Sequence, residues 1–119
     1  MLSRTFKKRD MESLINQKPT YNWAERMTEG EEVFTSSRIA KSDKILDTYL
    51  FNLSKAKETS EIWKAIKTVT KAFDKLNVDD DGFIDQAERE QLAGFIKYAA
   101  ETYGLKYEGD VTEEYRLEW

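Results

Sequence analysis

The spacing of apolar residues along this chain constrains its fold more than any other feature. In residues 60–76, for example, Ile62, Ile66 and Phe73 are separated by one or two helical turns, so that they share one face of a helix. Only one proline, Pro19, is present to break such patterns, and β-branched runs typical of strands are rare. The sequence therefore predicts an all-α protein.

Proline and glycine divide the pattern into about five helices with short connections. Pro19 ends the first helix because its ring removes a hydrogen-bond donor and clashes with the preceding turn. Gly30 and Gly104 provide stops for later helices. The predicted helices cover about residues 3–17, 23–28, 37–56 and 60–76, with Ser60 as the cap of the fourth, and a last helix carries residues 92–103. We expect residues 105–119 to pack back on the domain, with Thr112 able to cap a short helix there.

The length of 119 residues suits a single helical domain, residues 1–119, with one modest core. Hydrophobic residues make up 39% of the chain, which is enough to exclude a disordered polymer although 35% of the residues are charged. We expect Trp23 and Trp63 to be core or packing residues, whereas Trp119 could also serve a partner. The predicted architecture is a helical bundle.

Missing residue types exclude several functions. Without cysteine the chain has no disulfide, thiolate metal site or cysteine nucleophile, which suits a cytoplasmic protein. Without histidine it lacks the usual zinc ligand and general base, and no catalytic residues are predicted, so we do not expect an enzyme. The net charge of -4 disfavours nucleic-acid binding. No apolar run approaches the roughly 20 residues that cross a bilayer.

Residues 1–10 differ from the rest of the chain because four basic side chains stand there against one acid. Leu2 and Phe6 within this segment are spaced as one face of a helix. We interpret the segment as a solvated terminus, with a partner-docking or membrane-docking segment as the alternative.

The segment from Asn77 to Glu88 carries the clearest chemical pattern. Oxygen-bearing side chains stand at its first, third, fifth, ninth and twelfth positions. Ca²⁺ takes six to eight oxygen ligands, and a short loop surrounds it by turning alternate side chains inward. Gly82 allows the sharp turn that this requires. The predicted metal ligands are Asn77, Asp79, Asp81, the carbonyl of Phe83, Asp85 and Glu88, with Ca²⁺ favoured and Mg²⁺ as the alternative ion.

This loop and its flanks resemble the EF-hand family, of which calmodulin is the familiar example. The resemblance covers about residues 69–96 and includes Phe73 and Leu76 before the loop, Ile84 at its eighth position and Leu92 beyond it. It implies an EF-hand helix–loop–helix over about residues 60–104.

Three departures from the family accompany this resemblance. Asn77 replaces the commoner aspartate at the first position, and Arg89 follows Glu88 where an apolar residue is usual. EF-hands normally occur in pairs, yet this chain holds one copy. Ile84 must therefore pair with another loop of the same chain or with a second copy of the protein, as a homodimer.

A metal-free explanation exists for part of the pattern. Asp85 and Glu88 form a D-x-x-E capping box that starts a helix without any ion. It does not explain the oxygens upstream of it, nor the excess of seven acids over two bases between Asp74 and Glu90, which a divalent cation would relieve.

Two functions follow from these alternatives. The first is Ca²⁺ binding in a small non-enzymatic protein, with a structural or modulatory site, because all three methionines lie upstream of the loop and cannot form a Met-rich sensor groove beside it. The second is a small acidic helical interaction or inhibitor protein, similar to bacterial immunity proteins, in which the metal is incidental. Either function implies a protein partner that the sequence does not identify.

Overall fold

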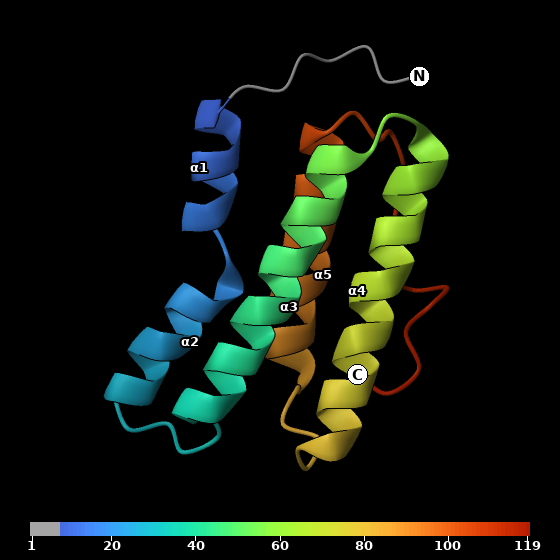
Figure 1. The fold of residues 1–119 in the computed structure, drawn as a ribbon. Coiled ribbons are helices and arrows are strands. Elements are labelled where there is room, and N and C mark those ends of the chain that lie inside the picture. The colour runs from blue at the N-terminus through green and yellow to red at the C-terminus, as the bar shows by residue number, and fades with distance from the viewer. Residues whose placement is uncertain (1–7) are drawn as a thin grey trace.

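Five α-helices account for most of residues 8–119, which are the residues that the computed structural model describes (Figure 1). The predicted all-α fold is confirmed. Residues 3–7 of the first predicted helix, and most of the basic segment, lie outside the described residues. Among residues 8–119, no helix is long and apolar enough to cross a bilayer. The helices are α1 Lys8–Asn16, α2 Pro19–Thr28, α3 Ser36–Lys55, α4 Thr59–Asp79 and α5 Gln86–Thr102.

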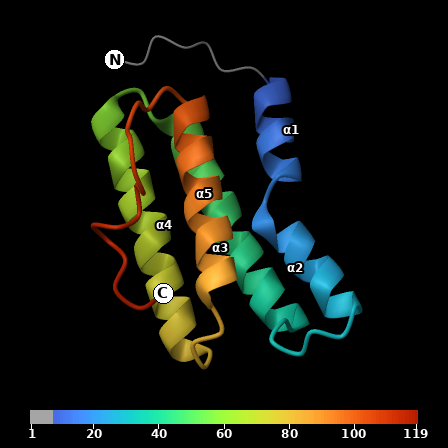
Figure 2. The same cartoon turned by 180° about the vertical axis from the view of Figure 1, so that it is seen from behind.

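Helices α3, α4 and α5 lie side by side, and α1 and α2 follow one another along one side of this group (Figures 1 and 2). Helix α2 contacts both α3 and α5. The connection from α2 to α3 and the loop from α4 to α5 lie at the same end of the molecule (Figure 1). Side chains from the ends of α2 and α3 can therefore reach the α4–α5 loop.

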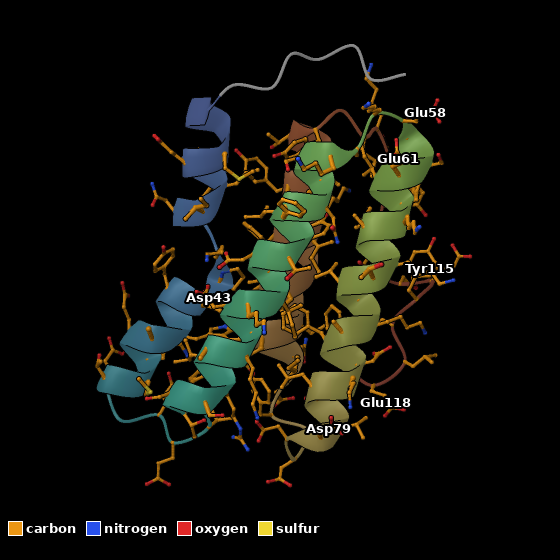
Figure 3. All side chains as sticks on the ribbon, in the orientation of Figure 1. Asp43, Glu58, Glu61, Asp79, Tyr115 and Glu118 are labelled. Carbon is orange, nitrogen blue, oxygen red and sulfur yellow. The ribbon has the colours of Figure 1, made fainter. Side chains whose placement is uncertain are left out.

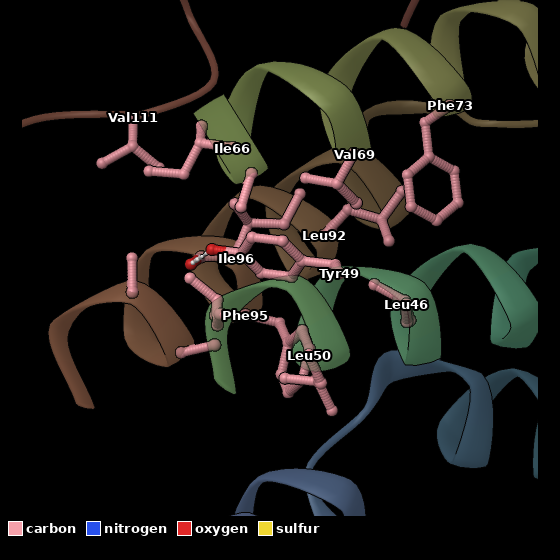
Figure 4. Close-up of a cluster of buried hydrophobic side chains, with 14 of the residues drawn as sticks. Leu46, Tyr49, Leu50, Ile66, Val69, Phe73, Leu92, Phe95, Ile96 and Val111 are labelled. Atoms are coloured by element: carbon pink, nitrogen blue, oxygen red, sulfur yellow. Dashed lines mark hydrogen bonds between the residues drawn. The ribbon is translucent and has the colours of Figure 1, made fainter. Parts of the chain in front are cut away.

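The core forms where the apolar stripes of α3, α4 and α5 meet (Figure 4). Leu46, Phe73 and Ile96 are fully buried there, as their helical spacing predicts. The hydroxyl of Tyr49 donates to the carbonyl of Ile96 at 2.7 Å. Burial raises the pKa of Tyr49 well above its ordinary value, so the hydroxyl remains a neutral donor that joins α3 to α5.

Local hydrogen bonds set helix boundaries that differ slightly from the predicted ones. Pro19 not only follows α1 but begins α2, because its fixed φ suits the first helical position. The predicted cap of α4, Ser60, is wrong. Glu58 caps α4 instead, in a reciprocal pair with Glu61. At its other end α4 continues three residues beyond the predicted Leu76, to Asp79.

A buried charge ties the corner between α1 and α2 to α3. The Lys18 side chain is only 4% exposed, and its ammonium lies 2.7 Å from carboxylate oxygens of both Asp43 and Asp47. Burial alone would lower the pKa of Lys18, but these two carboxylates outweigh it and raise the pKa above its ordinary value. The pairing keeps Lys18 charged although it is buried.

Residues 105–119, the C-terminal tail, pack back on the domain, as predicted, but they form turns and no helix. Val111 and Trp119 are buried in the core. Thr112 therefore caps no helix. Its backbone N–H and its hydroxyl both donate to Oδ1 of Asp110.

Residues 116–119 lie along α4 and form what we call the C-terminal strap. The indole N–H of Trp119 donates to the carbonyl of Thr70 at 3.1 Å, and its ring lies 6.0 Å from that of Phe73. Asp74 accepts hydrogen bonds from the backbone N–H groups of Leu117 and Glu118. Glu118 is drawn beside the lower part of α4, close to the start of the segment 77–88 that carries the predicted ligands (Figure 3).

Candidate metal centre

The candidate loop, residues 77–88, begins inside α4 because that helix continues through Asp79. The chain then turns at Asp81 and Gly82, whose φ angles are 61° and 64°. Glycine adopts this left-handed conformation freely, and aspartate is one of the few other residues that tolerate it. The Gly82 N–H donates to the carbonyl of Asn77 at 2.8 Å and closes the end of the helix. Gly82 thus forms the sharp turn that the sequence predicts.

Asn77, the first predicted ligand, is 5% exposed and has a hydrogen bond at each end of its amide. Its Oδ1 accepts from the backbone N–H of Ile84 at 2.8 Å. Its Nδ2 donates to the carbonyl of Glu118 at 2.6 Å. An aspartate could not make the second bond, so asparagine at this position joins the candidate loop to the C-terminal strap.

The next two predicted ligands point away from the loop interior. Asp79 accepts a hydrogen bond from the ammonium of Lys75, one helical turn earlier, at 2.8 Å. This bond raises the pKa of Lys75 above its ordinary value. The Asp81 side chain is 95% exposed, with the guanidinium of Arg38 3.8 Å away. Both carboxylates lie on the surface, each beside a basic side chain.

Glu88, the twelfth residue, lies on the first turn of α5 and is 3% exposed. Its Oε1 accepts from the backbone N–H of Asp85 at 3.1 Å, and the Asp85 side chain caps α5 in return. The D-x-x-E capping box predicted as the metal-free explanation is therefore present. Oε2 accepts from Nη1 of Arg26 at 3.0 Å.

Phe83 and Ile84 connect the turn to the core and are both buried. The Phe83 ring lies edge-on to Trp23, with 6.2 Å between their centroids. The backbone N–H of Ile84 is satisfied by Asn77 of the same chain. The loop geometry therefore gives no argument for a homodimer formed through Ile84.

The residue types of the loop fit a hard cation, but their arrangement does not form a coordination sphere. Within residues 8–119, no three acidic side chains gather as metal ligands would. Asn77 and Glu88 each use their oxygens for hydrogen bonds within the protein, and Asp81 faces solvent. Binding an ion would require rotation of side chains and the loss of internal hydrogen bonds.

A hollow of about 600 Å³ lies beside the loop. Its rim carries acids from the candidate loop and bases from other helices. The charged residues that line it are Asp81, Asp85, Glu88, Arg26 and Arg38.

Sequence reasoning did not place the two arginines, Arg26 and Arg38, beside the loop. Arg26 comes from the last turn of α2 and contacts Glu88, while Arg38 comes from the first turn of α3 and contacts Asp80. Neither lies within the twelve-residue pattern, and no spacing signal in the sequence links them to it. Only the packing of α2 and α3 against the loop brings them there.

Comparisons with protein-family models, with curated proteins and with solved structures find no match for this chain. The geometry of the loop must therefore carry any functional conclusion.

Replacement of Asn77 by aspartate tests the link between the loop and the strap. We expect Asn77→Asp to lower the free energy of unfolding in chelator by about 1–3 kcal/mol, because a carboxylate oxygen then faces the Glu118 carbonyl without a donor. The same change adds a negative charge to the loop and should strengthen Ca²⁺ binding. Urea unfolding with and without Ca²⁺ measures both effects.

The matched control is Asn22→Asp. Asn22 uses its Oδ1 to accept from Gln91, and aspartate retains that acceptor. If Asn77→Asp and Asn22→Asp have equal stability in chelator, the Asn77 bond to the strap contributes nothing measurable.

Proposed function

We propose that this chain binds Ca²⁺ through residues 77–88 and that the site is structural or modulatory. The observation that carries the proposal is the buried Glu88 carboxylate, which lies on the first turn of α5 beside a hollow whose rim also carries Asp81 and Asp85. A buried carboxylate requires a positive partner, which is Arg26 in this structure and would be Ca²⁺ when the ion is bound. The oxygen spacing and the Gly82 turn support the same proposal.

The ligands would be the side chains of Asn77, Asp79, Asp81, Asp85 and Glu88 and the carbonyl of Phe83. Asp79 and Asp81 are exposed, so turning them inward costs little packing. Glu88 needs only to exchange partners, since it already lies at the loop. The flexible ring of oxygens favours Ca²⁺ over Mg²⁺, which prefers a tighter octahedron.

A modulatory role suits this loop better than a sensor of the calmodulin kind. Among the described methionines, Met11 and Met27 lie on α1 and α2 and pack against the core, so neither belongs to the helices α4 and α5 that flank the loop. Phe73 of α4 and Leu92 and Phe95 of α5, the helices on either side of the loop, are buried in the core. We therefore expect the ion to stabilise or adjust the α4–α5 corner without opening a large apolar groove.

Titration of the chelated protein with Ca²⁺ and then with Mg²⁺ in a calorimeter tests the proposal. We expect heat with Ca²⁺ and a weaker response with Mg²⁺. A Ca²⁺ concentration of about 100 times Kd should also raise Tm by roughly 10 °C, because an ion that binds only the folded state stabilises it. No heat and an unchanged Tm at millimolar Ca²⁺ would refute the proposal.

The second candidate is a small acidic interaction or inhibitor protein that uses no metal. The specific observation in its favour is that the capping box and the two arginines already satisfy much of the loop's charge. This candidate predicts that Tm is the same in Ca²⁺ and in chelator. The melting experiment above therefore separates the two functions.

A further inference from the structure

Arg26 is held between two carboxylates at the end of α2. Its Nε and Nη2 donate to the two oxygens of Glu31 at 2.6 and 3.1 Å, and Nη1 donates to Glu88. The guanidinium also lies 4.5 Å from the centre of the Phe34 ring. The hydrogen bond to Glu31, followed by that to Glu88, raises the pKa of Arg26 despite some burial. Arg26 is thus a fixed positive charge against the buried end of the candidate loop.

Arg38 holds the opposite side of the same loop from the start of α3. Its Nε donates to the Asp80 carboxylate at 3.0 Å, and Nη2 donates to the Asp80 carbonyl at 3.3 Å. Nη1 donates to the carbonyl of Val33 at 2.7 Å. The guanidinium lies 5.1 Å from the centre of the Phe83 ring. The Arg38 side chain is only 15% exposed, so its ion pair with Asp80 is largely shielded from solvent.

Both arginines supply the charge that a divalent cation would otherwise bring. The loop is rich in acids, and without a cation they repel one another. Glu88 cannot give both oxygens to an ion while Oε2 accepts from Arg26. An ion beside Glu88 would also lie close to a guanidinium of like charge, which is unfavourable in a partly buried site. Arg26 and the ion therefore compete for the Glu88 oxygens, and Arg38, 3.8 Å from the Asp81 carboxylate, competes with the ion for that group.

We propose that Arg26 and Arg38 are built-in counter-ions of the loop. They hold the loop in an ion-free arrangement and set the Ca²⁺ concentration at which the loop rearranges to bind the ion. The inference rests on the proposed function. When the ion displaces Arg26 from Glu88, Arg26 remains paired with Glu31. The end of α2 then keeps its own ion pair but loses its ion pair with α5. Ion binding is then coupled to the contact between α2 and α5.

The test compares Arg26→Gln with Arg89→Gln. Arg89 directly follows Glu88 but forms no ion pair with any described residue, so its replacement removes an equal charge near the loop without breaking a specific contact. Calorimetric titration of both chelated variants with Ca²⁺ should give a Kd about tenfold lower for Arg26→Gln than for Arg89→Gln. In chelator, Arg26→Gln should unfold at lower urea, because Glu88 is left buried without its cation.

Equal Ca²⁺ affinities in the two variants would overturn the inference while leaving the proposed function intact. Ca²⁺ binding by Arg26→Gln but not by the parent, titrated alongside it, would overturn both the proposed function and the inference, because no Ca²⁺ concentration would then change the natural loop. If neither the parent nor Arg26→Gln binds Ca²⁺, both the inference and the proposed function are overturned. Should Arg26→Gln fail to fold in chelator, Arg38→Gln is measured against Arg89→Gln, and the same tenfold difference is required.

Discussion

Replacement of Trp23 by alanine is expected to lower the free energy of unfolding by about 3–5 kcal/mol. Trp23 is fully buried and joins three parts of the molecule. It stacks on Phe34 at 5.5 Å, meets Phe83 of the candidate loop edge-on, and donates its indole N–H to Gln91 of α5 at 2.8 Å. Because domains of this size are stable by only about 5–15 kcal/mol, this loss could unfold much of the protein. Urea unfolding monitored by circular dichroism measures it.

Trp63→Ala is the control for that prediction. Trp63 is only partly buried and packs edge-on against Tyr107 at 5.0 Å, so its replacement should cost roughly half as much. Equal costs for the two variants would mean that Trp23 does not connect α2 to the loop and α5 in the way described.

Replacement of Glu88 by glutamine is expected to weaken Ca²⁺ binding by about 100-fold, or about 2.7 kcal/mol, because one charge and one of two anionic oxygens are lost. Stability in chelator should also fall, by about 1–3 kcal/mol, because the amide Nε2 would face Nη1 of Arg26 where Oε2 now accepts a hydrogen bond. Glutamine at the third helical position also completes a capping box, so the bond to the Asp85 N–H survives. Calorimetry and urea unfolding of the same preparation separate these two effects.

Glu90→Gln controls for charge alone. Glu90 is exposed, two residues beyond Glu88, and accepts only a long 3.4 Å hydrogen bond from Gln86. Its replacement should leave the Ca²⁺ affinity within a few-fold of the parent. A similar loss in both variants would show that the loop attracts the ion through its net charge and not through Glu88 as a ligand.

Helical spacing was sufficient to predict the fold because it is a local property. Ile62, Ile66 and Phe73 share one face of any helix that contains them, and the core requires that face to be buried. Gly104 likewise ends α5 through its own positive φ of 110°. The caps were less predictable. Glu58 and Ser60 are both able to cap, and the choice depends on where the chain leaves α3.

The contents of the candidate loop could be predicted from the sequence, but its arrangement could not. Asn77 through Glu88 were identified by spacing alone, whereas Arg26 and Arg38 approach the loop only after α2 and α3 have packed. The strap bond from Glu118 to Asn77 spans 41 residues and has no local signal. Long-range partners of this kind decide which oxygens are free, and single-sequence patterns do not contain them.

A crystal structure of the protein grown with millimolar Ca²⁺ would show whether the loop binds the ion. We expect one ion at about 2.3–2.6 Å from oxygens of Asn77, Asp79, Asp81, Phe83 and Glu88, with the Asp85 side chain turned toward it. We also expect that Arg26 has left Glu88 and remains on Glu31. An ordered loop without an ion, in which Arg26 still donates to Glu88 and the carboxylate of Asp81 still faces solvent, would refute Ca²⁺ binding by this loop.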